Sequence, residues 1–444
     1  MTPGARAAAA IELLDAVEAD LTRPVDALVA GWFRKRRYAG GGDRRTIQSI
    51  LYTVLRRRAQ IDWWLEAAGR PVESRSRAIA ALLLGEVWSE AELDAAFDGG
   101  QYRPAPLDEG ERTLAAALAG KGFDDSAQPV HVRGNIPGWM EEKFRAALGD
   151  SLETELTALM REAPVDLRIN SLKTTREAVA GLLAAQGIES TPTPFSPLGL
   201  RLAGRINLAN SAIIRDGLAE PQDESSQIAA LLAGARPGEA IVDFCAGAGG
   251  KTLALAAMME DRGRIVACDT SPGRLDRARP RLERAGVEIA ELQVLEGEDG
   301  LWPGAQEGGY DCVLVDAPCS GTGAWRRHPE ARWRINSENL MQYMALQTRI
   351  LTAASRLVVP GGRLVYGVCS LLPEEGEGQV AEFLRNCPDF NAFPVAKAWG
   401  TRLDSDCPVE DVFLRLRPDR DGTDGFFVAI LVRDDRPSSI LFAQ

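Results

Sequence analysis

The chain has 444 residues, about two to three times the usual length of one domain, which favours two or three folded units. It carries 51 lysines and arginines against 63 aspartates and glutamates. This formal net charge of −12 argues at first sight against a protein that binds nucleic-acid phosphates. With 45% hydrophobic residues and no apolar run of about 18 residues, the composition excludes a membrane span and wholesale disorder and is typical of a globular protein.

Cysteine usage and the N-terminus narrow the class of protein further. The seven cysteines form no CxxC pair and only two histidines accompany them, so we expect neither a disulfide framework nor a metal site. Acidic residues stand near the N-terminus where a secretory signal would need an apolar core, so we expect a cytoplasmic protein with no membrane partner. Any cysteine chemistry should therefore use free thiols.

The net charge is divided unevenly along the chain. Residues 32–77 include twelve basic and four acidic residues, so this segment carries +8 and leaves −20 for the remainder. Within it, apolar residues spaced three and four apart predict a helix with one buried face: Ile47, Ile50, Leu51, Val54 and Leu55. The segment fits contact with RNA, and it equally fits a solvated, arginine-rich face of a helical domain.

In chain order, residues 1–126 are predicted to form an all-helical domain. An apolar stripe marks its first helix: Ile11, Leu14, Val17 and Leu21. The polar, glycine-containing stretch 120–129 is the best candidate for a linker.

Residues 130–215 are predicted to form a small α+β subdomain. We expect helices and strands in it at 139–147 (helix), 165–170 (strand), 174–185 (helix) and 200–202 (strand). From 216 to 435, β-rich runs alternate with helical ones, and we expect strands at 241–244, 264–268, 312–316, 363–366 and 426–432. This alternation is typical of a doubly wound α/β sheet.

A glycine-rich turn follows the first of these strands. It reads Asp243-Phe-Cys245-Ala-Gly-Ala-Gly-Gly-Lys251 and would let a ligand approach the backbone. A phosphate-binding P-loop would need glycine where Cys245 stands, so that motif is excluded, whereas a dinucleotide fold stays open. Asp269 and Asp299 also follow strands, where a carboxylate can bind ribose hydroxyls. These acids, with Asp243, favour an adenosine-containing cofactor.

Two cysteines lie at the predicted carboxyl edge of the sheet. Cys319 is in Asp316-Ala-Pro-Cys319-Ser-Gly-Thr-Gly323, and Cys369 is in Val368-Cys369-Ser370. Helix N-termini and nearby cations at this edge could favour the thiolate form. The other five cysteines are expected to be small buried apolar residues.

These motifs resemble the Nop/Sun family of RNA cytosine-5 methyltransferases, over roughly residues 130–433. Further matches are Leu167-Arg-Ile-Asn170, Gln222-Asp-Glu-Ser-Ser-Gln227, Arg327-His-Pro329 and Asp424-Gly-Phe-Phe427. Residues 1–126, with Gly42-Asp-Arg-Arg45, look like the NusB-like RNA-binding domain of the bacterial 16S ribosomal RNA members. The resemblance implies a multidomain α and α/β protein: the NusB-like domain, an RRM/ferredoxin-like subdomain at 130–215, and a Rossmann-like class I methyltransferase domain at 216–435.

The resemblance also implies a cofactor and residue roles. S-adenosylmethionine would be held by Cys245, Ala246, Gly247, Ala248, Gly249, Gly250, Lys251, Asp269, Asp299 and Asp316. Cys369 would add to carbon 6 of cytosine, Cys319 would assist the final elimination, and Asp316 would lie beside the base. The expected partner is 16S ribosomal RNA or a small-subunit precursor, bound by a monomer. The alternatives are a transfer RNA cytosine-5 methyltransferase and an inactive RNA-binding ribosome-assembly factor.

Two motifs depart from the family pattern. The usual Cys-Ala-Ala-Pro-Gly-Gly-Lys lacks its proline here, although the glycines and Lys251 remain. The usual Thr before the second cysteine is Val368, so the hydroxyl next to that thiol is missing. A further cluster could contact phosphates and stack on bases, although core packing is favoured for its tryptophans: Trp325, Arg326, Arg327, His328, Arg332, Trp333 and Arg334.

Overall fold

The computed structural model describes residues 1–20, 23–204, 206, 208, 211–297, 300–403 and 405–435. The chain packs as two compact units. The first holds Met1–Glu162 with Trp325–Asn336, and the second holds Ala163–Ala324 with the chain from Ser337 onward. None of the described helices is long and apolar enough to cross a membrane.

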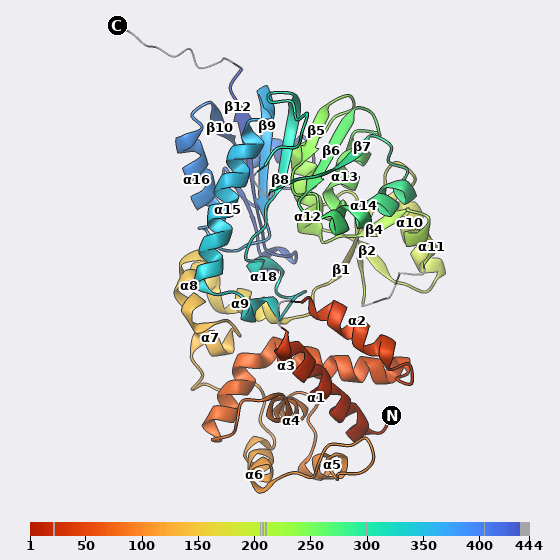
Figure 1. Cartoon of the computed structure of the whole chain (residues 1–444), viewed down its shortest axis with the longest axis vertical. Coiled ribbons are helices and arrows are strands. Elements are labelled where there is room, and N and C mark those ends of the chain that lie inside the picture. Colours follow the sequence, from red (N-terminus) through yellow and green to blue (C-terminus); the bar gives the residue numbers. More distant parts are fainter. Residues whose placement is uncertain are drawn as a thin grey trace. The chain divides into compact units, whose positions relative to one another are not determined.

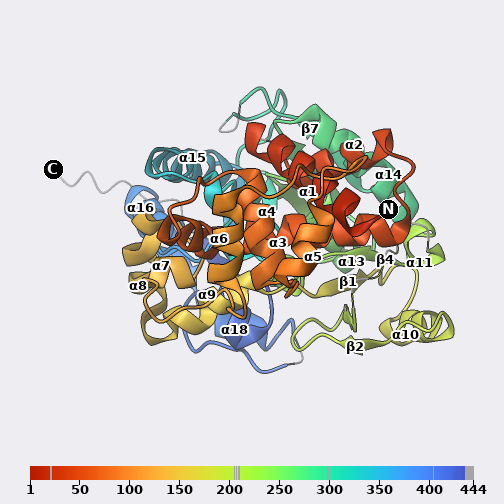
Figure 2. The ribbon, with the colours of Figure 1, turned by 90° about the horizontal axis from the view of Figure 1, so that it is seen from below.

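All the regular elements among the described residues of the first unit are helices (Figure 1). Its α-helices are α1 (Pro3–Ala19), α2 (Val25–Lys35), α3 (Gly41–Ala67), α4 (Ser74–Leu84), α5 (Glu90–Ala96), α6 (Glu109–Leu118), α7 (Val130–Arg133), α8 (Glu141–Leu148) and α9 (Leu152–Met160). Helices α1, α3 and α4 pack against one another in its core (Figure 2). The apolar face predicted at 47–55 is buried in α3, and Leu14 and Val17 are buried in α1, whereas Leu21 lies outside the described residues.

The segment Trp325–Asn336 belongs to this helical unit. Trp325 and Arg332 are fully buried, and the Arg332 guanidinium donates to the carbonyl oxygens of Asn135 at 2.9 Å and Leu159 at 3.0 Å. Burial lowers the pKa of Arg332 to about 9. The sequence-based expectation of a phosphate contact is wrong for Arg332, because its donors are turned inward onto backbone carbonyls. Core packing is confirmed for Trp325.

The second unit contains a small antiparallel sheet with the order β2-β3-β1-β4. Its elements are β1 (Val165–Ile169), α10 (Arg176–Ala185), β2 (Ser190–Pro192), β3 (Gly199–Leu202), α11 (Ala212–Arg215) and β4 (Ala219–Pro221). Leu167 and Ile169 of β1 pack with Val179 and Leu183 of α10 in one apolar cluster. The predicted α+β fold is confirmed for this sheet and α10, whereas the helix predicted at 139–147 belongs to the helical unit as α8 (Glu141–Leu148).

The large sheet of this unit has the order β10-β12-β9-β8-β5-β6-β7, with β11 beside β12. Its strands are β5 (Ala240–Asp243), β6 (Arg264–Asp269), β7 (Ala290–Val294), β8 (Tyr310–Asp316), β9 (Val358–Val368), β10 (Phe390–Phe393), β11 (Leu414–Leu416) and β12 (Phe426–Arg433). The five strands from β9 to β7 run parallel, and β12 is antiparallel to β9. Each of the five predicted strands is present.

Helices cover both faces of this sheet (Figure 1). On one face, Ile241 of β5 lies in the apolar cluster of α12 (Glu224–Ala233), α13 (Gly250–Met258) and α14 (Pro272–Ala285). On the other, the neighbouring Val242 lies in the cluster of α15 (Ser337–Ser355) and α16 (Glu377–Asn386). Burial on both faces explains why the central strands are continuous apolar runs. The doubly wound α/β architecture is confirmed.

Candidate functional site

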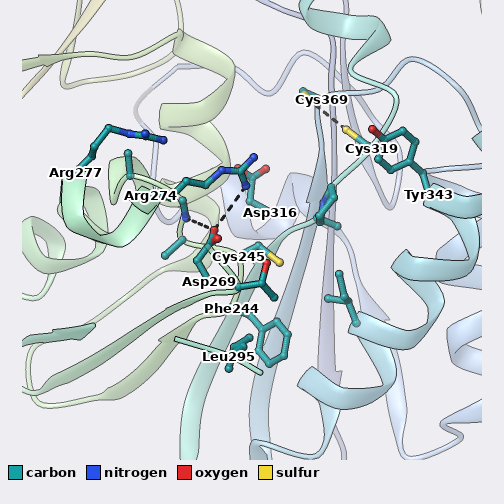
Figure 3. A pocket seen from close by; sticks show the side chains of 17 residues that line it. Phe244, Cys245, Asp269, Arg274, Arg277, Leu295, Asp316, Cys319, Tyr343 and Cys369 are labelled. Atoms are coloured by element: carbon teal, nitrogen blue, oxygen red, sulfur yellow. Dashed lines mark hydrogen bonds and ion pairs between the residues drawn. The ribbon is translucent and has the colours of Figure 1, made fainter. Parts of the chain in front are cut away.

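A pocket of about 570 Å³ opens at the carboxyl ends of β5, β6, β7, β8 and β9 (Figure 3). Its lining residues come from the glycine-rich turn, the ends of these strands and α14 and α15: Phe244, Cys245, Ala246, Gly247, Ala248, Asp269, Thr270, Arg274, Arg277, Leu295, Asp316, Ala317, Pro318, Cys319, Tyr343, Ile350 and Cys369. Open α/β sheets bind ligands at this edge because the carboxyl ends of parallel strands converge there. The structure therefore brings most of the predicted site residues together.

Two glycines of the glycine-rich turn have a left-handed backbone conformation. Gly247 has φ +57° and Gly249 has φ +78°, conformations that other residues rarely adopt. A Cβ on Gly249 would stand 3.0 Å from the Cβ of Ala278, whereas one on Gly247 would meet open space. The Gly247 N–H donates to Asp269 Oδ2 at 2.9 Å, which ties the turn to the end of β6.

Lys251 does not line the pocket, but its ammonium reaches a residue that does. Its Nζ lies 2.6 Å from Asp316 Oδ2 and 5.2 Å from the ring centre of Phe426. The Lys251 side chain is only 9% exposed, whereas that of Asp316 is 34% exposed, so the ammonium is shielded from water and the carboxylate stays accessible.

A second carboxylate lies beneath the turn and is fully buried. Asp243 Oδ2 accepts a hydrogen bond from the Thr252 hydroxyl at 2.7 Å, and its Oδ1 has no hydrogen-bond partner among the described residues. Burial raises the pKa of Asp243 to about 6. Asp243 therefore supports the turn and does not line the pocket.

The two predicted reactive cysteines form a pair (Figure 3). The Sγ atoms of Cys319 and Cys369 are 3.5 Å apart, although the residues are 50 positions apart in sequence. Hydrogen bonding to Cys369, together with burial, raises the pKa of Cys319 well above its ordinary value. By contrast, Cys268 and Cys312 are buried within the sheet, and burial raises the pKa of Cys312 to about 11.

Several of the proposed cofactor residues do not border the pocket. Gly249 and Gly250 are absent from its lining, and Asp299 lies outside the described residues. Conversely, Arg274, Arg277 and Tyr343 line the pocket although no motif marked them. The two arginines lie on the helix that follows Asp269, so their spacing from that strand end is the signal that could have found them. No described group of His, Cys, Asp or Glu side chains is placed to hold a metal ion.

The basic residues of the helical unit differ in exposure. Arg34, Lys35, Arg37 and Arg45 are exposed to solvent. Arg77 is 5% exposed and forms ion pairs with Asp62 and Glu18. Others, Arg57 and Arg58 among them, are half-buried. The +8 segment thus combines a solvated basic face with arginines that hold the helices together.

Comparisons with known proteins agree with the fold. A family model described as 16S rRNA methyltransferase RsmB/F matches residues 229–432, and an RsmF/B-like ferredoxin-like domain model matches 136–209. A probable ribosomal RNA small subunit methyltransferase B of Synechocystis sp. is 31% identical over 411 residues, 88% of this chain and 91% of the relative. Ribosomal RNA small subunit methyltransferase B of Sodalis glossinidius is 30% identical, over 78% of this chain and 82% of the relative.

A solved structure has a similar fold. That of PH0851 matches with a TM-score of 0.78 and 25% identity, covering 97% of this chain and 99% of the other. The chain belongs to the RsmB/F family of 16S rRNA methyltransferases, enzymes that depend on S-adenosylmethionine.

Proposed function

We propose that this enzyme methylates carbon 5 of a cytosine in 16S ribosomal RNA through a covalent cysteine adduct. The observation that carries the proposal is the pair of thiols, Cys319 and Cys369, 3.5 Å apart at the edge of the pocket. Carbon 5 of cytosine has no lone pair to offer a methyl group, so it must first be activated. A methyltransferase acting on an amino group would need no thiol.

The pocket residues fit S-adenosylmethionine. Its volume is in the range of small-molecule sites. Both oxygens of Asp269 accept backbone N–H groups, from Gly247 and Ser271, and each keeps a lone pair that a ribose hydroxyl can use. The open space over Gly247 lets a ligand approach the turn. When bound, the cofactor supplies a methyl group carried on a positively charged sulfur.

In this mechanism Cys369 is the nucleophile. Its thiolate adds to carbon 6, which makes carbon 5 electron-rich enough to take the methyl group. A base such as water then accepts the carbon 5 proton, the double bond between carbons 5 and 6 re-forms, and Cys369 leaves carbon 6 as a thiolate. Cys319, whose raised pKa keeps it a thiol beside Cys369, assists this release by donating a hydrogen bond to the departing sulfur. Lys251 holds one oxygen of Asp316, which leaves the other to hydrogen-bond and orient the base.

The RNA substrate is proposed from the relatives and from surface charge. Both relatives described above are named small subunit methyltransferases. In this chain, residues 1–126 are proposed as the RNA-binding domain, 130–215 as the ferredoxin-like subdomain and 216–435 as the catalytic domain of a monomeric, cytoplasmic enzyme. The exposed cations Arg34, Lys35 and Arg37 suit phosphate contacts, and the target base must be unpaired or extruded to enter the pocket.

A map of 5-methylcytosine in total RNA tests the proposal. Deletion of the gene should remove one mark from 16S ribosomal RNA, and the wild-type gene, but not a Cys369→Ser variant, should restore it. Loss of a mark from transfer RNA would favour the transfer RNA methyltransferase instead. An unchanged map, together with no binding of S-adenosylmethionine by calorimetry, would favour an inactive assembly factor.

A further inference from the structure

The two thiols lie on separate turns that need a common support. Cys319 follows β8 and Cys369 follows β9. Because a cysteine side chain is short, a small shift of either turn would separate the two sulfur atoms. Backbone hydrogen bonds already join the two turns, from Gly323 N–H to the Cys369 carbonyl at 3.0 Å and from Ala317 N–H to the Gly367 carbonyl at 2.9 Å. The turns also meet through side chains, since the Ser370 hydroxyl lies 3.3 Å from that of Ser320 and 3.1 Å from that of Thr322. A buried carboxylate that accepts from both serines would join the turns more firmly than these contacts between hydroxyls.

Glu375 makes that connection from beneath the turns. Its side chain is fully buried and does not line the pocket. Oε1 accepts the Ser320 N–H at 2.8 Å, and Oε2 accepts the hydroxyls of Ser320 and of Ser370, the latter at 2.6 Å. Ser320 and Ser370 are the residues directly after Cys319 and Cys369, so one carboxyl group holds both turns.

The carboxyl group of Glu375 acts as an acceptor in each of these contacts. A further bond comes from Gln347 Nε2 of α15, 3.1 Å from Oε1. A buried carboxylate is costly unless hydrogen bonds replace its water, and four donors converge here. The charge of Glu375 also contributes to the raised pKa of Cys319, after hydrogen bonding to Cys369 and burial.

We propose that Glu375 is a positioning residue that sets the separation of the Cys319 and Cys369 sulfurs by binding the backbone and hydroxyl of Ser320 and the hydroxyl of Ser370. Its importance for catalysis rests on the function proposed above, but its effect on thiol geometry does not. Glu375 touches neither the pocket nor the reacting atoms, so it acts only through the two cysteines.

Glu375→Gln tests this proposal. The glutamine side chain has the same size as that of glutamate, but its NH₂ group would face the N–H and O–H donors that the carboxylate accepts. Glu377→Gln is the matched control: it makes the same change two residues away, where the carboxylate pairs with Arg415. Two readouts are taken on the full chain. One is kcat, with KM for RNA and the dissociation constant for S-adenosylmethionine. The other is the equilibrium of the Cys319–Cys369 disulfide with oxidised and reduced glutathione, with the linked peptide identified by mass spectrometry.

We expect Glu375→Gln to lower kcat and the equilibrium constant for thiol pairing each by about 10- to 100-fold, since a hydrogen-bonded carboxylate is lost. Cofactor affinity and KM should stay within about threefold, and Glu377→Gln should change neither readout. Ser320→Ala, which removes one hydroxyl, should lower kcat and the equilibrium constant for thiol pairing by a smaller factor. This variant replaces Glu375→Gln in the test if Glu375→Gln does not fold. Unchanged thiol pairing in the variant that folds would overturn the proposal, whereas altered pairing in an enzyme that makes no 5-methylcytosine would refute only the proposed function.

Discussion

Replacing Asp243 with asparagine should change how stability depends on pH. The Asp243 side chain is fully buried, and burial raises its pKa from 3.8 to about 6. Well below pH 3.8 the residue is protonated in both the folded and the unfolded chain, so its burial then carries no ionisation cost. As the pH rises from about 4 to about 6, the unfolded chain ionises first, so the folded state loses stability. A shift of about 2 pH units corresponds to about 3 kcal/mol.

The Asp243→Asn variant lacks this penalty. Its side-chain oxygen can still accept the Thr252 hydroxyl, while the buried amide adds a cost that does not vary with pH. Thermal unfolding of both proteins at pH 4, 5, 6 and 7 should show the melting temperature of the variant rising relative to that of the wild type as the pH rises, by about 1–2 °C per kcal/mol in a chain of this size. Asp276→Asn, on the exposed side of α14, controls for loss of a surface carboxylate. A melting difference that stays constant or shrinks between pH 4 and 7 would refute the reasoning.

Two further predictions concern cations. Lys251→Met removes the partner of Asp316 and should lower single-turnover methylation by about 100-fold; a loss below about threefold would show that the ion pair has no catalytic role. Neutralising Arg34, Lys35 and Arg37 together should weaken RNA binding and reduce the slope of log affinity against log salt by about 2, measured by fluorescence anisotropy. An unchanged slope would place the RNA elsewhere.

The sequence was sufficient to predict the central sheet because its strands are buried on both faces. Strands such as β5 and β8 are short apolar runs that end in an acidic residue, Asp243 and Asp316, and both features can be read without coordinates. Strand β7, at the sheet edge, was not predicted, since it is half-exposed and mixes glutamate and glutamine with apolar residues. Edge strands lose the pattern that marks their neighbours.

Within the site, the sequence placed Cys319 and Cys369 at one edge but could not give their 3.5 Å separation. It also could not show that Lys251 reaches across to Asp316, because that pairing depends on the side chain's path beside Phe426. No sequence motif indicated a role for the buried Glu375. Long-range polar contacts of this kind are set by packing, and local patterning does not encode them.

Contrasting serine variants of the two cysteines test the central claim most directly. Each variant is incubated with S-adenosylmethionine and 16S ribosomal RNA, and the covalent protein–RNA adduct is measured by denaturing electrophoresis alongside methyl transfer. Cys369→Ser should form no adduct and transfer no methyl group, because the nucleophile is gone. Cys319→Ser should accumulate the adduct, because release fails. An adduct that persists in Cys369→Ser would contradict the assignment of the nucleophile and with it the proposed mechanism.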